Sequence, residues 1–209
     1  MTDQIPTRSR AGWGQIDAEH DTADADKVLG HPMLADLLRL WTGLCRKGEL
    51  PSRDDLDSAI FRPGVFPQII LLEGVERGGR RDLRYRMMGN ALAGNFGSDM
   101  TGRFIRDIFA DPNYADELIA LSYLVIDGRR PIATSGRFAP DDRAEEPAMV
   151  YRLGLPLKGL PSGTPLLLVC QMTVWNGQII ERPVRAPHSY ESISVVAFTD
   201  RSPGRNSPK

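Results

Sequence analysis

Apolar and polar side chains alternate between Leu83 and Met87, and this period of two indicates a strand with one buried face. Leu83, Tyr85 and Met87 would face the core, while Arg84 and Arg86 would face solvent. The alternation does not continue beyond this segment, so the pattern predicts a different structure after the strand.

Two short apolar segments follow the strand in place of one long helix. Leu92 and Phe96 are four residues apart and predict a short helix, which Gly97 would close in the left-handed conformation. A second short helix is expected after Gly102, with residues 104–109 providing its apolar side. A strand that is followed by short helices predicts a concave cover over a sheet, and hence a pocket.

The other elements follow from the same kinds of pattern. An apolar strand is expected at 67–73, and the glycines at 78–79 predict a hairpin turn into the strand at 83–88. Downstream, a helix is expected from Asp111-Pro112 to Gly128, followed by strands at 131–138, 148–157 and 165–174. Together they predict the α+β class, with a five-stranded antiparallel sheet that is covered by short helices.

An amphipathic helix is expected near the N-terminus, at residues 31–48. Its apolar face, which is wider than one core contact requires, includes Leu34, Leu37, Leu38, Trp41 and Leu44. Either the helix lies in a groove of its own domain, or one flank packs against the same helix of a second chain.

The central stretch resembles a PAS domain. In that family a strand ends in an Asn at the start of a short helix, and glycines follow; Asn90, Gly97 and Gly102 occupy these positions. With the segments at 50–54 and 85–89, the chain is similar to a bacterial subgroup of stand-alone single-PAS-domain proteins. The resemblance implies a sensory module, and it favours a homodimer formed through the N-terminal helix.

Three regions are expected along the chain. Residues 1–27 are polar and acidic and predict a flexible tail. Residues 28–175 would form the PAS-like domain with its N-terminal helix, and residues 176–209 a mostly extended or disordered tail. Within that tail, 193–198 could add an edge strand or fold onto a partner, and disorder is expected from residue 201.

Composition narrows the possible partners. The chain has 209 residues, of which 41% are hydrophobic and 25% charged, and its net charge is -1, so neither a nucleic acid nor an anionic membrane is favoured as a partner. Cys45 and Cys170 are far apart and no signal peptide is evident, which argues against a secreted disulfide framework. No apolar run is long enough to cross a bilayer. The expected location is the cytoplasm.

Sequence motifs give no support for common catalytic machinery. The chain has no phosphate-binding glycine loop, no metalloprotease His-Glu-x-x-His and no Gly-x-Ser-x-Gly elbow. His20, His31 and His188 are interpreted as solvated histidines. The acidic residues between 141 and 146 match no calcium loop and are interpreted as a solvated hairpin tip.

Arginines form the only basic concentration, at positions 77, 80, 81, 84 and 86. Arg77 and Arg81 are four residues apart, as in the arginine pair that clamps cyclic dinucleotides, but the expected Asn/Asp-x-Ser-x-x-Gly companion does not follow. An exposed strand face is the preferred interpretation, and phosphate binding by the guanidinium groups is the alternative.

The resemblance also bears on cofactors. Flavin-binding light sensors of this fold need a reactive Cys shortly after the glycine that matches Gly102, and Ile105 stands there instead. Haem-binding members use a His on the long helix, and residues 114–125 contain none. A photoreactive flavin adduct and a His-ligated haem are therefore not expected, a non-covalent flavin stays open, and the cofactor is unknown.

The expected pocket lies between the sheet and the short helices. Its predicted lining is Tyr85, Met87, Asn90, Leu92, Phe96, Phe104, Leu118, Ser122, Tyr151, Leu153, Gln171 and Met172, with Asn90, Ser122 and Gln171 as the polar groups that would orient a ligand. The predicted function is non-catalytic: a sensory or interaction module that binds a small ligand or a separate signalling partner protein. The alternatives are an enzyme that uses Tyr85 or Tyr151 as acid or base, and a ligand-free dimerisation scaffold.

Overall fold

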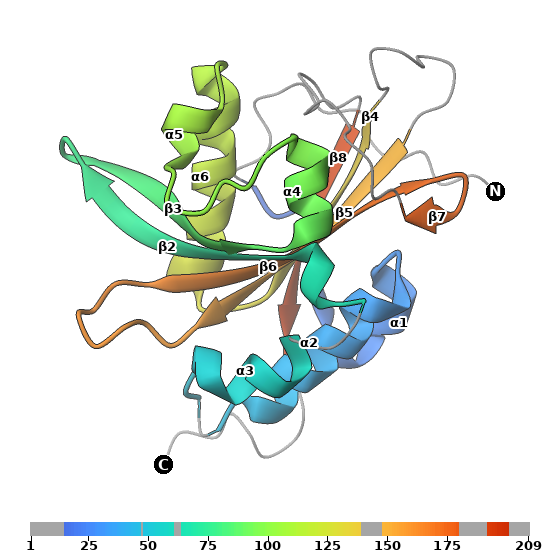
Figure 1. The fold of residues 1–209 in the computed structure, drawn as a ribbon. Helices are drawn as coiled ribbons and strands as arrows, with labels where there is room; N and C mark the ends of the chain where they lie inside the picture. The colour runs from blue at the N-terminus through green and yellow to red at the C-terminus, as the bar shows by residue number, and fades with distance from the viewer. Residues whose placement is uncertain (1–14, 47, 61–63, 139–147, 180–191, 201–209) are drawn as a thin grey trace.

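The computed structural model describes residues 15–46, 48–60, 64–138, 148–179 and 192–200. Eight strands form one mixed sheet in the order β1-β8-β4-β5-β6-β2-β3, and β7 pairs with β6 outside this path (Figure 1). The strands are β1 (Ala18–Asp21), β2 (Ile69–Arg77), β3 (Arg80–Met88), β4 (Ile132–Phe138), β5 (Ala148–Leu157), β6 (Leu166–Trp175), β7 (Gln178–Ile179) and β8 (Ser192–Thr199). The α+β class is confirmed, but the sheet is larger than the five strands expected.

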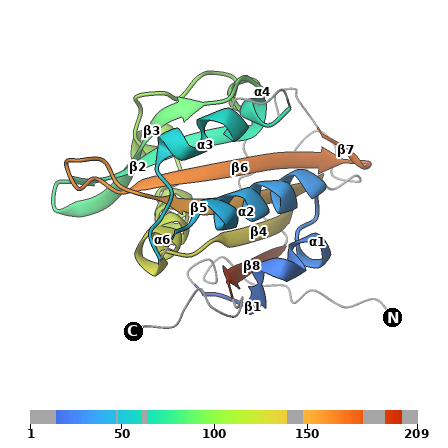
Figure 2. The same ribbon diagram turned by 90° about the horizontal axis from the view of Figure 1, so that it is seen from below.

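Helices connect the strands and cover the sheet. They are η2 (Thr22–Asp24), α1 (Ala25–Val28), α2 (Pro32–Leu44), α3 (Arg53–Ile60), η3 (Phe66–Gln68), α4 (Asn90–Phe96), α5 (Ile105–Ile108) and α6 (Pro112–Gly128). Figure 1 shows α4, α5 and α6 on one side of the sheet, here called the upper face, and α1, α2 and α3 on the other, the lower face, which Figure 2 shows from below. The chain is therefore layered as helices, sheet and helices.

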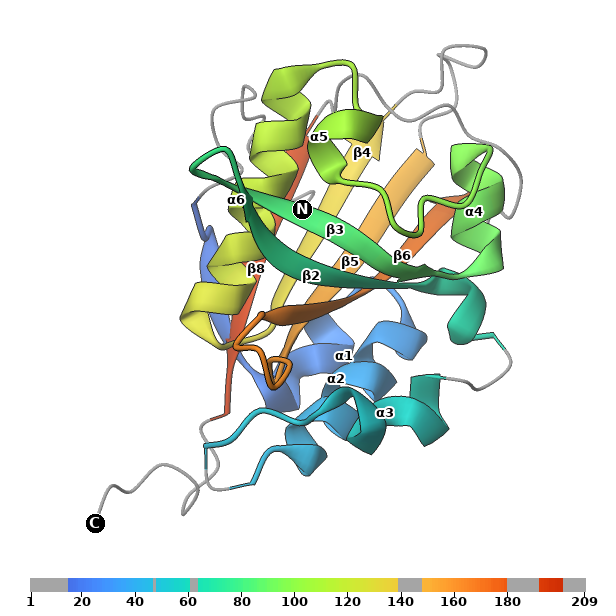
Figure 3. The ribbon, with the colours of Figure 1, turned by 60° about the vertical axis from the view of Figure 1, so that its left-hand side comes forward.

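Five strands match the elements that the hydrophobic pattern predicts. The β2–β3 hairpin turns at Gly78-Gly79, with Arg77 opposite Arg80, and β2 pairs antiparallel with β6 on its other side. The meander of β4, β5 and β6 is also antiparallel. Figure 3 shows α4, α5 and α6, which follow β3 in the chain, lying over these strands.

Two strands besides the five expected extend the sheet beyond β4. β8 pairs antiparallel with β4, and β1 runs parallel to β8. The predicted flexible tail at 1–27 is thus wrong for residues 18–27. Residues 193–198 do add a strand, but it does not form the edge of the sheet because β1 lies outside it. The tail predicted at 176–209 is likewise wrong for residues 192–199, which form β8 in the sheet. The expectations for residues 1–14 and from 201 onward fall outside the described residues.

Packing of α2 against the lower face decides between the two interpretations of its wide apolar stripe. His31 accepts a hydrogen bond from the Met33 N–H at 3.2 Å, Pro32 begins the helix, and the helix ends at Leu44, short of the predicted residue 48. Four of the predicted dimer-interface residues are buried within the chain itself, and Leu44 packs against the same cluster; the four are Leu34, Leu37, Leu38 and Trp41. Since their own sheet covers them, these residues offer no surface to a second chain.

Candidate functional site

A cavity lies between the upper face of the sheet and the helices that cover it, and its hollow space is about 70 Å³. β2, β3, β4, β5 and β6 contribute its floor and one wall, and α4, α5 and α6 contribute its roof. It lies in the part of the fold where the sequence predicts a pocket.

The register of three strands gives the cavity floor two rows. Ile132, Gly154 and Val169 are cross-strand neighbours and form an apolar row. Gly154 lets Val125 of α6 pack closely against this row, because a Cβ atom there would meet Val125 Cγ2 at 3.0 Å.

The second floor row is polar. Thr134, Arg152 and Gln171 are cross-strand neighbours on β4, β5 and β6, and all three line the cavity. One end of the floor is therefore hydrocarbon, and the other carries a hydroxyl, a guanidinium and an amide.

The roof is apolar and rich in aromatic residues. Phe109 makes edge-on contacts with Phe96 and Tyr114, at ring-centroid distances of 6.2 and 5.0 Å. Leu118 and Ser122 are one helical turn apart on α6 and both face the cavity. The Ser122 hydroxyl donates a hydrogen bond to the Leu118 carbonyl at 2.8 Å, so its proton is already used within the helix.

Four polar side chains, Tyr85, Thr134, Arg152 and Gln171, give the cavity its chemistry. The Arg152 Nε–H donates a hydrogen bond to Gln171 Oε1 at 2.6 Å. The Thr134 hydroxyl oxygen is buried and has no hydrogen-bond partner. Burial raises the pKa of Tyr85 to about 12, against the opposing charge of Arg152, so the phenol is neutral and remains an O–H donor.

Of the predicted lining residues, the structure brings five together at the cavity: Tyr85, Phe96, Leu118, Ser122 and Gln171. Met87, Tyr151, Leu153 and Met172 instead belong to the packed cluster of the lower face. Met87 does not share the face of Tyr85 as the alternation predicts, because a β-bulge shifts the β2–β3 register between the pairs Leu72–Tyr85 and Leu71–Met87. In β5 and β6, which have helices on both faces, both faces are apolar, so alternation could not tell which set meets the cavity.

Three further predicted lining residues lie beside the cavity without lining it. Leu92 is buried in the core cluster of the upper face, Phe104 lies beneath the guanidinium of Arg77, and Asn90 is exposed at the start of α4. Asn90 makes no side-chain cap, because Gly89 occupies the N-cap position.

Sequence reasoning missed Thr134 and Arg152. A usable signal for Arg152 was a charged residue within the otherwise apolar segment from Tyr151 to Leu157, where a strand covered on both faces would have no reason to place a charge. Thr134 gave no such signal, since threonine is ordinary in strands.

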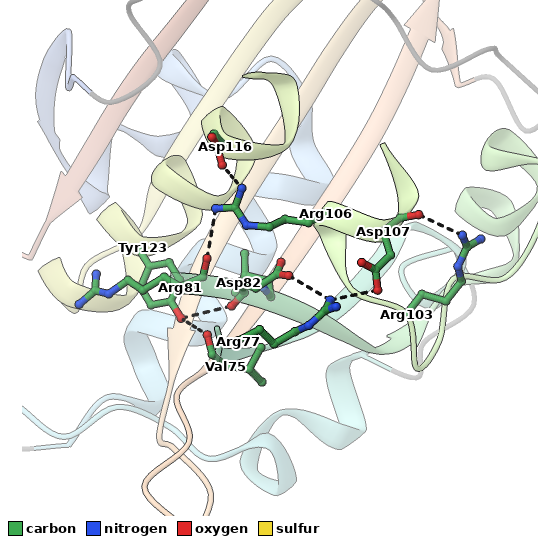
Figure 4. A network of polar contacts seen from close by, with 10 residues as sticks. Val75, Arg77, Arg81, Asp82, Arg103, Arg106, Asp107, Asp116 and Tyr123 are labelled. Carbon is green, nitrogen blue, oxygen red and sulfur yellow. Dashed lines mark hydrogen bonds and ion pairs between the residues drawn. The ribbon is translucent and has the colours of Figure 1, made fainter. Parts of the chain in front are cut away.

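The hairpin arginines fasten the roof of the cavity to the sheet. Arg77 contacts Asp107 of α5 at 3.0 Å and Asp82 at 3.4 Å, and Arg106 pairs with Asp116 of α6 (Figure 4). α5 is therefore tied to the β2–β3 hairpin on one side and to α6 on the other.

Arg77 and Arg81 do not converge on one ligand. Arg77 lies over the Phe104 ring at 4.1 Å. Arg81 lies over Tyr123 at 4.4 Å (Figure 4) and pairs with Asp127 at 2.6 Å. Arg84 and Arg86 both bind Glu73. The geometry gives no support to a cyclic-dinucleotide clamp.

An open groove of about 650 Å³ lies between the hairpin and α6. Its four arginines are all ion-paired: Arg80 and Arg106 with Asp116, Arg81 with Asp127, and Arg130 with Glu19. A phosphate would have to displace these carboxylates, so the arginines are better explained by their structural contacts.

The described residues contain no metal site, and the buried thiol of Cys170 stays protonated. Within them, no cluster of three or more His, Cys, Asp or Glu side chains could hold a metal ion. Burial raises the pKa of Cys170 to about 12, which keeps its thiol protonated.

No helix in the described ranges is long and apolar enough to cross a membrane. Comparison of the chain with protein-family models, with curated proteins and with solved structures finds no significant match.

Proposed function

We propose that this protein is a non-catalytic sensory or interaction module of the PAS type, which binds a small ligand in the cavity and signals to a separate partner protein. The order of elements supports this proposal: two antiparallel strands, then α4, α5 and α6, then three antiparallel strands. Gly97 supports it as well, because it ends α4 in the left-handed conformation, with φ of 79°.

The observation that carries the proposal is the cavity itself. It has apolar walls, one polar row and a neutral phenol. Small-molecule sites typically combine a hydrophobic lining with a few polar groups in this way. The carboxylates buried in the described core, Glu73 and Asp82, do not line it, so we assign no catalytic acid or base.

The size of the cavity favours a small ligand. About 70 Å³ is well below the roughly 300–1,000 Å³ of drug-sized pockets. An apolar cavity of roughly 150 Å³ accepts benzene. We therefore expect a molecule no larger than about this size, whereas a flavin or a haem would require the roof helices to move apart.

Helix α5 offers a route by which the cavity can influence the surface. Ile105 and Phe109 contact the cavity at either end of this helix, while Arg106 and Asp107 are held by residues on α6 and β2 (Figure 4). A ligand that displaces α5 would strain these ion pairs and move the hairpin. A homodimer stays part of the proposal, through residues other than the four that α2 buries.

Native mass spectrometry of gently purified protein tests the proposal. We expect a bound organic molecule that denaturation releases, and its loss in a Ser122→Leu variant, which fills the cavity from the roof. A matched Ser98→Leu change on the exposed loop after α4 serves as control. An empty protein whose cavity also excludes xenon would contradict the proposal and favour a dimerisation scaffold.

A further inference from the structure

We infer that the cavity binds a small uncharged carbonyl compound, and that the hydroxyl of Thr134 donates a hydrogen bond to the carbonyl oxygen. This inference rests on the proposed function, because it names the chemical class of ligand for the same cavity. Two features of the lining carry it: a buried hydroxyl that lacks a partner, and hydrogen-bond donors that lie beside hydrocarbon.

Thr134 is a buried polar residue of the cavity floor. Only 5% of this residue is exposed, and its hydroxyl oxygen has no hydrogen-bond partner in the described part of the chain. Buried polar groups are almost always paired, so an orphan hydroxyl in a cavity lining calls for a ligand atom or a water. A ligand oxygen at this place would make a hydrogen bond that the protein alone leaves unmade.

Strand pairing holds this hydroxyl in place. Thr134 lies opposite Arg152 of β5 on one side and opposite Val195 of β8 on the other, so its backbone is held within the sheet from both sides. Ile132, two residues earlier on β4, lines the same cavity, as the period of a strand requires. The hydroxyl is therefore a preformed contact for a ligand, next to the apolar row of the floor.

The polar groups near Thr134 offer donors more than acceptors. Gln171 Oε1 already accepts the hydrogen bond from Arg152 Nε–H at 2.6 Å, and the amide nitrogen of Gln171 can only donate. Tyr85 also lines the cavity, and its phenol keeps a proton that it can donate because burial raises its pKa. A ligand that supplies only an acceptor fits this set. A carbonyl oxygen has two lone pairs and no proton of its own.

The remaining lining favours an uncharged ligand. None of the described lining residues is a carboxylate, so a cation would find no counter-charge. An anion would lose its hydration beside Ile132, Val169 and Leu118, which offer only hydrocarbon. Arg152 is already hydrogen-bonded within the sheet, and we assign it a structural role. A ketone or aldehyde with short hydrocarbon groups fits, since a carbonyl group costs far less to bury than an ion.

Binding of cyclopentanone and of methylenecyclopentane, followed by NMR on the full chain, tests the inference. The two molecules have the same shape, and a methylene group replaces the carbonyl oxygen in the second. We expect both to shift the methyl signals of Val169 and Leu118. Thr134→Val removes the hydroxyl at nearly constant shape, so it should weaken cyclopentanone about fivefold while leaving the affinity for methylenecyclopentane unchanged.

Two further variants separate the hydroxyl from packing. Thr134→Ser keeps the hydroxyl and should keep the ratio of the two affinities close to that of the unchanged protein. Thr42→Val is the control, because the Thr42 hydroxyl donates to the Leu38 carbonyl on the lower face, and neither affinity should change. The chemical shift of the bound carbonyl carbon is a second readout: a hydrogen bond moves it downfield, and Thr134→Val should reverse this change.

The outcomes separate this inference from the proposed function. An unchanged affinity ratio in Thr134→Val would show that the hydroxyl does not bind the carbonyl oxygen. Tighter binding of isobutyrate than of cyclopentanone would exclude the preference for an uncharged ligand. Either result would overturn the inference while leaving a cavity that binds ligands. If xenon and both ring compounds leave the methyl signals unshifted, the inference and the proposed function fail together.

Discussion

Thr134 lines the proposed binding cavity, and its hydroxyl should lower the stability of the fold. Its buried hydroxyl has no partner in the ligand-free protein. Thr134→Val keeps the shape and removes the unpaired group, so we expect the free energy of unfolding to rise by about 1 kcal/mol. Urea unfolding without ligand measures this. Thr42→Val is the control, because the Thr42 hydroxyl donates to the Leu38 carbonyl at 2.8 Å and its removal should bring no gain. A loss of stability in Thr134→Val would contradict the role given to this residue.

Glu73 is a buried carboxylate with a structural role, and its pKa predicts how stability depends on pH. Burial acts to raise its pKa, but hydrogen bonds and charges from Arg86 and Arg84 outweigh it, so the pKa is lower than usual. Because the pKa is lower in the folded state, the ionised carboxylate stabilises the fold at pH values above its ordinary pKa of about 4.3. That stability disappears as the pH falls through the folded-state pKa.

We therefore expect Glu73→Gln to destabilise the protein by roughly 2 kcal/mol at pH 7. The difference from the unchanged protein should narrow steadily as the pH falls from 5 toward 3. Urea unfolding at several pH values follows it. Glu76→Gln, an exposed neighbour on the same strand, should show neither effect. A constant difference at all pH values would mean that packing, and not the charge, stabilises this site.

Single residues of the cavity were only partly predictable from the sequence. Tyr85 and Gln171 were found because the central strand and β6 were placed correctly. Tyr151 and Leu153 were assigned to the cavity, yet Arg152 between them lines it. A shift of one residue along a strand exchanges the two faces, and with helices on both faces hydrophobicity alone does not resolve the choice.

At the scale of elements, glycine positions test the helix ends separately from packing. Gly97 ends α4 with φ of 79°, and Gly43 lies inside α2; a Cβ atom would meet nothing within 4 Å at either position. Gly97→Ala should cost about 1 kcal/mol because an L-residue is strained there. Gly43→Ala should gain about 1 kcal/mol through helix propensity. Thermal unfolding of the pair compares them, and effects of the same sign would exclude the backbone explanation.

Most helices and the five strands β2 to β6 were predictable because each has a local signal. Asp111 accepts a hydrogen bond from the Asn113 N–H at 3.0 Å, as the Asp-Pro start predicts. Ser52 and Asp55 form a reciprocal cap before α3, and their spacing of three residues is typical of a capping box. The wide apolar face of α2 was also evident. The surface against which this face packs was not evident, because the same apolar stripe suits a sheet or a second helix. In the structure it packs within the chain, and the Trp41 Nε1–H donates a hydrogen bond to the Pro156 carbonyl at 2.9 Å.

At the scale of the whole molecule, pairing distant in sequence was not predictable. β1 reads Ala-Glu-His-Asp and has no apolar alternation. It forms a strand because its backbone pairs with β8, more than 170 residues away, where Ala18 lies opposite Val196. Backbone hydrogen bonds of this kind leave no mark on side-chain composition, which is why the acidic segment was interpreted as a tail.

The position of β1 predicts what protects the edge of the sheet. Asp17 and Val195 exchange two hydrogen bonds of 2.8 Å, one through the Asp17 side chain, and Arg130 pairs with Glu19 at 2.7 Å. Removing β1 would leave the N–H and C=O groups of β8 unpaired along an apolar strand, which is a template for association with other chains.

We therefore compare a chain that begins at Thr22, which lacks β1, with a chain that begins at Gln15, which keeps it. The free energy of unfolding should be roughly 2 to 4 kcal/mol lower for the chain that begins at Thr22. It should also form dimers or larger species at micromolar concentration. Urea unfolding and light scattering compare the two truncations. Asp17→Ala within the full chain removes one edge bond without exposing the whole strand, and it should cost about 1 kcal/mol while the oligomeric state stays unchanged. If the chain that begins at Thr22 were as stable as the longer one and did not associate, pairing with β1 would not stabilise β8. The side chains of β8 would then be what protects the edge of the sheet.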